Sequence, residues 1–354
     1  MRNMKGFVLH GPKDLKYEDR PMPTIAKGEV LVRVRRTGIC GSDVHYFLHG
    51  QIGSFIPKEP FALGHEFAGE IVELGTEVVD LQIGNRIAID PQIPCHICIF
   101  CKSSRYNLCE DMRFLGSAAC YPHIDGGFAQ YVPVPAINCL PLPEGMDYGY
   151  AALLEPLTVA VHAVRRPGAI GGGALAGKSV LITGAGTIGQ LALRVARSYG
   201  AGMLAVSDVD DFARTSSLEA GADHAFDPGD PEMEDIAREL SKGGFEVIIE
   251  ISGVPAALGQ ALCLARRGGT IVQVGSLPHE VTLPANLIMA KELAVLGSFR
   301  SVNVMYEALD LAASGRIDLD PIITSVFDFR ELPLAMETAV KKDKVIKVQI
   351  KQEG

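Results

Sequence analysis

The chain has 354 residues, of which 47% are hydrophobic and 21% charged, a globular composition with room for two or three domains. With 33 Lys plus Arg against 42 Asp plus Glu, the net charge is −9, which argues against nucleic acid or an anionic membrane as the main partner. No apolar run approaches the roughly 20 residues of a membrane span, and the first residues lack the apolar core of a secretory signal. We therefore expect a cytoplasmic protein whose eight cysteines are reduced thiols.

The first 150 residues have the pattern of short strands separated by turns. Residues 29–35 alternate between apolar and polar side chains, residues 70–74 and 86–89 are further short apolar runs, and Gly and Pro lie between them. The pattern predicts a mostly antiparallel, barrel-like domain over residues 1–150. Its end lies beside the Pro- and Gly-rich stretch 141–149.

Beyond Gly177 the pattern changes to strands that alternate with helices. After the first apolar run, Ile188, Leu191 and Val195 have the spacing of one helical face. Such alternation predicts an α/β fold with a doubly wound parallel sheet of the Rossmann type. We place this domain at residues 151–298 and expect residues 299–354 to return to the first domain. The predicted strands are 179–183, 203–207, 246–250, 270–274 and 293–296.

A glycine-rich turn follows the first of these strands. The segment Gly184–Gly189 has the sequence GAGTIG, in which the glycines permit a tight turn, close approach of a pyrophosphate and close packing of the helix. Asp208 ends the next predicted strand, where a carboxylate accepts hydrogen bonds from the ribose of NAD. The sequence therefore predicts a dinucleotide site for NAD, against the alternative of a purely structural turn. NADP remains the alternative cofactor, because Arg214 is near enough in sequence to accommodate its extra phosphate.

Four cysteines gather in one short segment. Cys95, Cys98, Cys101 and Cys109 form the pattern C-x₂-C-x₂-C-x₇-C. Four thiolates so close together fit a closed tetrahedral zinc site, which stabilises a lobe and leaves no position for chemistry. An iron–sulfur cluster is the alternative, but its bacterial pattern has a shorter last gap followed by Pro. Buried apolar cysteines are the other alternative. We expect a structural zinc lobe over about residues 90–112.

Three further segments contain metal-ligand residue types but are far apart in the chain. They hold Cys40, then His65 with Glu66, then Glu155 before a proline. Each has an ordinary explanation alone, since a buried His is usually a core residue and a Glu before Pro is often a helix cap.

Together these segments resemble the zinc-containing medium-chain alcohol dehydrogenase family. Gly64–Gly75 matches G-H-E-x₂-G-x₅-G, the zinc signature of that family, and the other motifs follow in the family's order. Residues 40–46 (CGSDVHY) and 297–300 (GSFR) resemble the polyol branch of sorbitol and xylitol dehydrogenases. Residues 111–117 and 121–128 are similar to bacterial L-idonate 5-dehydrogenases, with a segment at 116–123 that is longer than in sorbitol dehydrogenases. Phe212 departs from the family, where many members have Arg or Lys near the adenosine.

The resemblance implies a fold and a set of roles. Residues 1–150 would form a GroES-like catalytic domain, and Cys40, His65 and Glu66 would hold a catalytic zinc, with Glu155 bound directly or through water. Ser42 and His45 would relay the proton, and Arg300 would contact a carboxylate or vicinal hydroxyls of the substrate. The residues assigned to the cofactor are Gly184, Gly186, Thr187, Ile188, Gly189, Asp208 and Val274. With the four-cysteine site, the chain would carry two zinc ions.

These roles predict an oxidoreductase of carbohydrate metabolism, which transfers hydride from a secondary alcohol of an aldonate or polyol to NAD. A sorbitol- or xylitol-type enzyme is the main alternative, and another zinc alcohol or threonine dehydrogenase is a weaker one. A zinc-free quinone or enone reductase has no use for Cys40 with His65, and a redox sensor without activity would not need the complete ligand set. The family also implies a dimer or tetramer, in which strand Leu293–Ser298 could form the contact.

Overall fold

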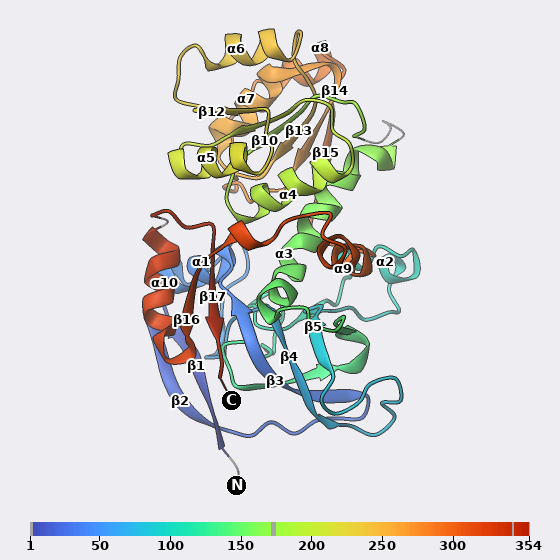
Figure 1. The fold of residues 1–354 in the computed structure, drawn as a ribbon, viewed down its shortest axis with the longest axis vertical. Coiled ribbons are helices and arrows are strands. Elements are labelled where there is room, and N and C mark those ends of the chain that lie inside the picture. The colour runs from blue at the N-terminus through green and yellow to red at the C-terminus, as the bar shows by residue number, and fades with distance from the viewer. Residues whose placement is uncertain (1–2, 171–174, 342, 354) are drawn as a thin grey trace. The chain divides into compact units, whose positions relative to one another are not determined.

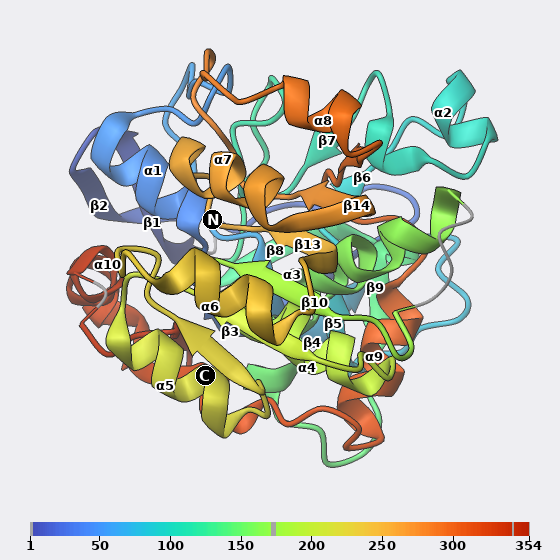
Figure 2. The ribbon, with the colours of Figure 1, turned by 90° about the horizontal axis from the view of Figure 1, so that it is seen from above.

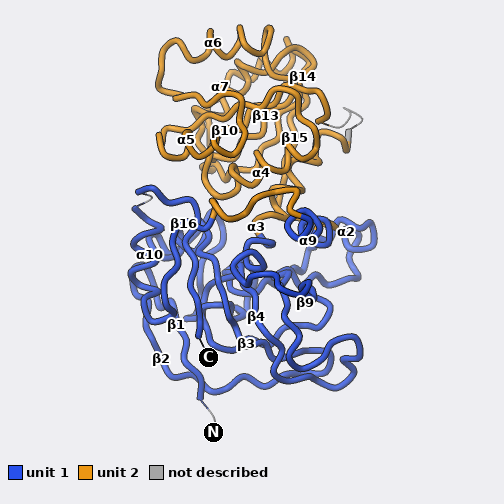
Figure 3. The backbone as a smooth tube through the Cα atoms, in the orientation of Figure 1, with its two compact units in different colours: residues 1–155, 305–314, 323–354 blue, residues 156–304, 315–322 orange. Residues whose placement is uncertain are grey.

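The computed structural model describes residues 3–170, 175–341 and 343–353. Two compact units divide the chain (Figure 3): unit 1 comprises Met1–Glu155, Met305–Ser314 and Ile323–Gly354, and unit 2 comprises Pro156–Val304 and Gly315–Ile322. The units therefore separate at residues 155 and 304, where the sequence analysis placed boundaries at 150 and 298. The first difference arises because helix α3 (Tyr148–Arg165) continues through the boundary.

Unit 1 is built on a seven-stranded sheet of order β16-β17-β3-β4-β5-β9, with β8 paired to β3. Every pairing in it is antiparallel except that of β16 with β17, which confirms the predicted mostly antiparallel sheet. The strands of unit 1 are β1 (Asn3–Gly11), β2 (Asp14–Pro21), β3 (Glu29–Gly38), β4 (Glu66–Leu74), β5 (Arg86–Ile89), β6 (Gln92–Ile93), β7 (Arg113–Phe114), β8 (Tyr131–Pro135), β9 (Cys139–Pro141), β16 (Ile323–Asp328) and β17 (Lys347–Lys351). Its helices are α1 (Gly41–His49), α2 (Ile99–Lys102), the first part of α3, α9 (Met305–Ala313) and α10 (Leu332–Lys341).

The two ends of the chain meet in this sheet. Strand β17, from the last residues, pairs with β3 near the start, and Figure 1 shows the two side by side in red and blue. Alternate residues of β3, Val30, Val32 and Val34, are buried in an apolar cluster with Phe67 and Ile87. The period-two pattern seen in the sequence thus buries one face of β3, as expected for a sheet.

Unit 2 is a six-stranded parallel sheet of order β12-β11-β10-β13-β14-β15. Helices lie on both faces of it (Figures 1 and 2), which confirms the predicted doubly wound α/β fold. Its strands are β10 (Val180–Thr183), β11 (Leu204–Ser207), β12 (His224–Phe226), β13 (Phe245–Glu250), β14 (Ala265–Gln273) and β15 (Ala294–Gly297). Its helices are the second part of α3, α4 (Thr187–Ser198), α5 (Asp211–Glu219), α6 (Met233–Leu240), α7 (Pro255–Leu264) and α8 (Asn286–Ala290).

The strand order of unit 2 reverses at β10. From β10 the chain runs outward to β11 and β12, and then returns to β13 on the other side of β10. In such sheets the crevice at the carboxyl ends of the two strands beside the reversal is the usual ligand site. The fold therefore places the turn after β10 and the loop after β13 at a candidate cofactor-binding edge.

None of the described helices combines the length and the apolar character that crossing a membrane requires.

Candidate metal centres and cofactor-binding edge

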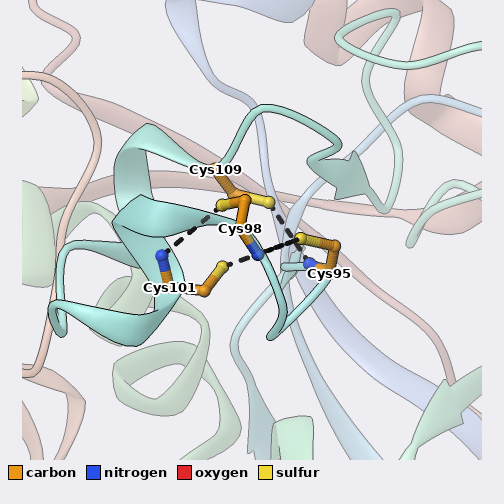
Figure 4. Close-up of side chains that lie close together, drawn as sticks. All are labelled: Cys95, Cys98, Cys101 and Cys109. Atoms are coloured by element: carbon orange, nitrogen blue, oxygen red, sulfur yellow. Dashed lines mark hydrogen bonds between the residues drawn. The ribbon is translucent and has the colours of Figure 1, made fainter.

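The four cysteines of the predicted lobe lie together around the short helix α2. Each offers a sulfur atom, and the four sulfurs lie within 4.8 Å of one another. Figure 4 shows the side chains gathered around one point, with the Cys95 and Cys101 sulfurs 4.0 Å apart. Backbone N–H groups of the same segment donate to the sulfurs, from Cys95 to Cys109 (3.2 Å) and from Cys98 to Cys95 (3.4 Å).

These thiols influence one another's ionisation. The backbone N–H groups of Cys101 and Glu110 lower the pKa of Cys98 to about 6. Desolvation and the neighbouring cysteines raise the pKa of Cys101 to about 12. Without a cation, Cys98 thus ionises readily whereas Cys101 resists ionisation. A divalent ion removes this conflict, because zinc binds cysteine as the thiolate.

A second group joins residues from distant parts of unit 1. Ligand atoms of Cys40, His65 and Glu66 lie within 4.8 Å of one another, near enough for one ion to lie among them. Cys40 is the N-cap residue of α1, and Glu66 begins β4. Ser42 lies in the first turn of α1, so Cys40 and Ser42 do not share an extended stretch.

The carboxylate of Glu66 also makes a buried ion pair with Lys347 of β17. The Lys347 Nζ lies 2.8 Å from Oε1 and 2.6 Å from Oε2, and donates to the carbonyl of Ile39 as well. The Lys347 and Glu66 side chains are only 2% and 1% exposed. A Cβ atom at Gly38 would clash with the Glu66 carboxylate, so only glycine leaves room for it there. Lys347 and Gly38 together fix where Glu66 points.

Asp43 is a further buried carboxylate of this group. It accepts the backbone N–H of Cys40 at 2.9 Å, and its Oδ1 lies 3.7 Å from Nδ1 of His65. Burial raises the pKa of Asp43 to about 6. Burial alone would lower the pKa of His65, but the charges of Cys40 and Asp43 raise it well above its usual value. The charges of Cys40 and Asp43 beside His65 therefore favour a positive charge at this point.

Glu155 lies within α3 rather than at a helix cap, and Pro156 follows it inside the same helix. It is not a member of the group formed by Cys40, His65 and Glu66, but its charge raises the pKa of His65. Burial raises the pKa of Glu155 itself to about 7. The structure thus brings this predicted residue near the group, with Glu66 closer to the two other ligand atoms.

The residues present fit a zinc ion at both places. In the group of Cys40, His65 and Glu66, hereafter the Cys40 group, Nδ1 of His65 is buried and has no hydrogen-bond partner among the described residues. The same holds for Oδ1 of the neighbouring Asp43. A thiolate, an imidazole and a carboxylate are the donor types that zinc selects, and three protein ligands leave a position open. Four thiolates instead fill every position.

The two predicted relay residues lie on helix α1. Ser42 and His45 are three positions apart, so they are neighbours on one helical face. The His45 ring is exposed, and its centroid lies 5.8 Å from that of His49. The structure thus places an exposed imidazole on the helix that begins at Cys40.

Segment 116–123 contacts helix α1, which begins after Cys40 in unit 1. Ser117 is buried, and its Oγ lies 3.3 Å from the hydroxyl of Tyr46, whose pKa burial raises to about 12. Just before the segment, the ring of Phe114 lies 5.8 Å from that of His65. Farther along, His123 stacks on Phe61 at 4.6 Å.

The glycine-rich turn lies at the carboxyl edge of the sheet of unit 2. Gly184 has a φ of +93°, which favours glycine, and Gly186 is the N-cap of α4. A Cβ at Gly189 would clash with the carbonyl of Gly184, whereas one at Gly186 would meet nothing within 4 Å. Gly189 therefore serves the fold, and Gly186 leaves open space at the helix N-terminus, where anions bind. Thr187 and Ile188 form the first turn of α4, and Val274 follows β14.

Asp208 contacts this turn. Its Oδ2 accepts the N–H of Ala185 at 2.6 Å and its Oδ1 accepts that of Asp210 at 2.9 Å. Arg214 donates to the backbone carbonyl of Asp208 and pairs with Asp211 at 3.2 Å and Asp227 at 3.6 Å. Arg214 is thus engaged by acidic neighbours.

Arg300 belongs to unit 2 and has an unusual backbone. Its φ is +54°, in the left-handed region that non-glycine residues adopt rarely. The guanidinium lies 4.8 Å from the centroid of the neighbouring Phe299 ring, which is half exposed.

Two buried charges at the Cys40 group were not found from the sequence. Lys347 lies in an alternating strand segment, where it has the pattern of a solvent-facing residue, yet its face of the sheet is buried. Asp43 follows Cys40 by three residues and could have been noticed as an N3 capping residue of α1.

Two protein-family models match the chain. The alcohol dehydrogenase GroES-like domain matches residues 26–144, and the zinc-binding dehydrogenase model matches residues 187–314. Among curated proteins, sorbitol dehydrogenase of Bacillus subtilis is 36% identical over 353 residues, covering 99% of this chain and 97% of that protein. A probable D-xylulose reductase A of Aspergillus terreus is 40% identical over 351 residues, covering 97% of each.

Solved structures are similar over the whole chain. L-idonate 5-dehydrogenase from Escherichia coli superposes with a TM-score of 0.92 at 34% identity, covering 99% of this chain and 98% of that one. A putative zinc-binding dehydrogenase from Sinorhizobium meliloti bound to NADP has a TM-score of 0.89 at 34% identity, covering 99% and 100%. An alcohol dehydrogenase from Escherichia coli complexed with NADH has a TM-score of 0.89 at 30% identity, covering 99% of both chains.

Proposed function

Because the chain belongs to the zinc-binding dehydrogenases with a GroES-like domain, we propose that it oxidises a secondary alcohol of an aldonate or polyol with NAD. The observation that carries this proposal is that ligand atoms of Cys40, His65 and Glu66, which are distant in sequence, lie within 4.8 Å of one another in unit 1. Full-length similarity to a sorbitol dehydrogenase supports the polyol class.

In this proposal Cys40, His65 and Glu66 hold the catalytic zinc, and Cys95, Cys98, Cys101 and Cys109 hold a structural one. Zinc at the first site supplies a Lewis acid that acidifies a coordinated hydroxyl group. Glu66 is the direct carboxylate ligand because one of its oxygens lies within 4.8 Å of the Cys40 and His65 ligand atoms, and Lys347 and Gly38 hold the carboxylate in place. Glu155 binds the zinc indirectly, through a water molecule. Asp43 adds a negative charge next to His65, with its Oδ1 3.7 Å from the Nδ1 of that ring.

Proton release follows helix α1. Ser42 and His45 are neighbours on that helix, which begins at the ligand Cys40. A hydroxyl near the substrate can pass a proton to the exposed imidazole, and an imidazole exchanges protons with solvent near neutral pH. His45 is therefore assigned the last step of the relay.

The cofactor in this proposal is NAD. Asp208 lies against the glycine-rich turn, and its carboxylate oxygens have lone pairs left for the ribose hydroxyls. Asp208, Asp210, Asp211 and Asp227 repel a ribose phosphate, and their neighbour Arg214 is already engaged. NADP is thus disfavoured, although the NADP-bound relative keeps it as the alternative to test.

The substrate favoured here is L-idonate, with sorbitol and xylitol as the second candidates. The structural similarity to L-idonate 5-dehydrogenase supports the acid, and the relatives named for sorbitol and D-xylulose support the polyols. Arg300 could bind a carboxylate through two N–H donors, or two hydroxyls of a polyol. Ser117 and Tyr46 are further candidates because they adjoin the Cys40 group.

We also propose a homo-oligomer, dimer or tetramer, and a cytoplasmic location. Strand β15 is an edge of the sheet of unit 2, and Val295 on it is 41% exposed. An unpaired edge is a ready template for the same strand of a second copy.

The test follows NADH absorbance over L-idonate, sorbitol, xylitol, galactitol and threonine, together with metal analysis. We expect two zinc ions per chain and the highest kcat/KM with L-idonate. Highest activity with sorbitol or xylitol would favour a polyol dehydrogenase instead. Highest activity with threonine would contradict both the aldonate and the polyol assignment. Two zincs without turnover of any alcohol would favour the redox sensor, and absence of zinc would favour the quinone or enone reductase.

A further inference from the structure

A row of polar side chains crosses the carboxyl edge of the sheet in unit 2. Strands β11, β10, β13 and β14 place Ser207, Thr183, Glu250 and Gln273 in register. Residues two positions earlier, such as Leu181 and Ile248, belong to the apolar core on the same face of the sheet. Ser207, Thr183 and Glu250 are 4%, 2% and 0% exposed. Glu250 is therefore a fully buried carboxyl group at the point where the strand order reverses.

Only part of the Glu250 carboxyl group is satisfied. Its Oε1 accepts the hydroxyl of Ser252 at 2.5 Å and the N–H of Gly253 at 2.9 Å. Its Oε2 and the Oγ1 of Thr183 are buried and have no hydrogen-bond partner in the described part of the chain. Burial raises the pKa of Glu250. An apolar side chain would avoid this unfavourable burial, so stability alone does not explain a glutamate here.

The loop that Glu250 holds lies tightly against the glycine-rich turn. A Cβ at Gly184 would lie 2.8 Å from the N atom of Ser252, and the N–H of Ser252 donates to the carbonyl of Thr183 at 3.0 Å. On its other side, Gly253 has a φ of +68° and a Cβ there would lie 2.6 Å from the carbonyl of Ser276. The loop therefore has little space to shift without moving the turn at Gly184.

We propose that Glu250 is a positioning residue for the dinucleotide. By holding Ser252 and Gly253, its carboxyl group fixes the loop that supports the turn at Gly184, where the pyrophosphate binds. The inference rests on the proposed function in one respect, namely that the ligand of this edge is NAD. Glu250 itself touches neither substrate nor cofactor in this account and acts through Ser252.

The first test measures NADH binding by the rise in NADH fluorescence. Glu250→Ala is expected to raise the dissociation constant at least tenfold, and Glu250→Gln, which keeps an acceptor oxygen, less than threefold. Val247→Ala is the matched control, because it empties a buried position of the same strand without touching the loop. It should lower the melting temperature and leave the dissociation constant unchanged. Wild-type NADH affinity in folded Glu250→Ala would overturn the proposal.

A second test asks whether Glu250 acts through Ser252. Ser252→Ala should weaken NADH binding about threefold, and the double variant should bind no more weakly than Glu250→Ala. Unchanged binding in Ser252→Ala, or effects that multiply in the double variant, would contradict the proposed route. If Glu250→Ala does not fold, NADH binding by Ser252→Ala alone tests the proposal.

Steady-state kinetics separate positioning from general damage. The KM for NAD should rise in the Glu250 variants, while the KM for the alcohol and the zinc content stay at wild-type values. An equal rise in both KM values would overturn the positioning role. If the wild-type protein itself failed to bind NADH, the proposed function would fail rather than this inference.

Discussion

A buried ion pair joins Lys347 of the last strand to Glu66, within the group of Cys40, His65 and Glu66. Removing one partner of a buried pair is destabilising, because the other charge is left without compensation in an apolar environment. Although burial lowers it, the charge of Glu66 raises the pKa of Lys347 above its usual value, so Lys347 is positively charged at neutral pH. This ion pair thus links the last strand to a residue that we propose as a zinc ligand.

Lys347→Gln should therefore reduce both stability and zinc retention at the Cys40 group. We expect a loss of about 3–5 kcal/mol in unfolding free energy, and at least tenfold weaker binding of one of the two zincs. Chelator competition and chemical denaturation measure the two quantities. Lys351→Gln is the control, because this exposed lysine of the same strand pairs with Asp328 and Glu353 at the surface. A loss from Lys351→Gln as large as that from Lys347→Gln would refute the assignment.

The side chain of His162 makes the folding stability of the protein depend on pH. Burial, with Arg166 and Arg165 nearby, lowers its pKa from 6.5 to about 4. Because the unfolded chain takes up this proton more readily, the stabilisation is complete above pH 6.5 and is lost as pH falls toward 4. His162→Gln should flatten the decline of the melting temperature across that window. Identical slopes for wild type and variant would show that His162 does not contribute.

At the scale of an element, two glycines of the glycine-rich turn have different roles: Gly189 is needed for folding, and Gly186 for binding the cofactor. Gly189→Ala forces a clash with the carbonyl of Gly184, so it should lower the melting temperature and abolish NADH binding together. Gly186→Ala meets open space, so the fold should persist while NADH binds at least tenfold more weakly, because the pyrophosphate approaches there. Thermal melting and fluorescence titration distinguish the two. Wild-type NADH binding by Gly186→Ala would remove the turn from the cofactor site.

The four-cysteine lobe makes another prediction at the scale of an element. Cys98→Ser should reduce the zinc content from two per chain to one and lower the melting temperature by about 4 °C or more. Cys263→Ser, at the end of α7 and outside both cysteine-containing groups, should keep both zincs. Metal analysis after dialysis measures the difference. Two zincs in Cys98→Ser would contradict the structural site.

Elements encoded by local patterns could be predicted, and those set by distant contacts could not. Helix α4 and the strands β10, β11 and β13 follow from apolar runs and spacing, because each buries residues close in sequence. Strand β12 (His224–Phe226) has no apolar run and is fixed by its pairing with β11. The helical position of Ser42 was missed because the alternation of β3 gives no sign of where the strand ends.

At the scale of the whole molecule, the proposed ligands of the catalytic zinc were identified by resemblance to a family and not by their spacing in the sequence. Cys40, His65 and Glu155 are far apart in sequence, and only the folded unit 1 brings them near one another. Lys347 is 281 residues from Glu66, and no local rule distinguishes it from an exposed strand lysine. Contacts over such separations depend on the complete sheet, in which the last strand pairs with the third.

The central claim is that zinc lies within the group of Cys40, His65 and Glu66 in the folded protein. Diffraction from crystals of the zinc-loaded enzyme, recorded on both sides of the zinc absorption edge, tests it directly. We expect two anomalous peaks per chain, one among the four cysteines and one within bonding distance of Cys40 and His65. A peak at the cysteines alone, with His65 and Glu66 turned away from Cys40, would contradict it.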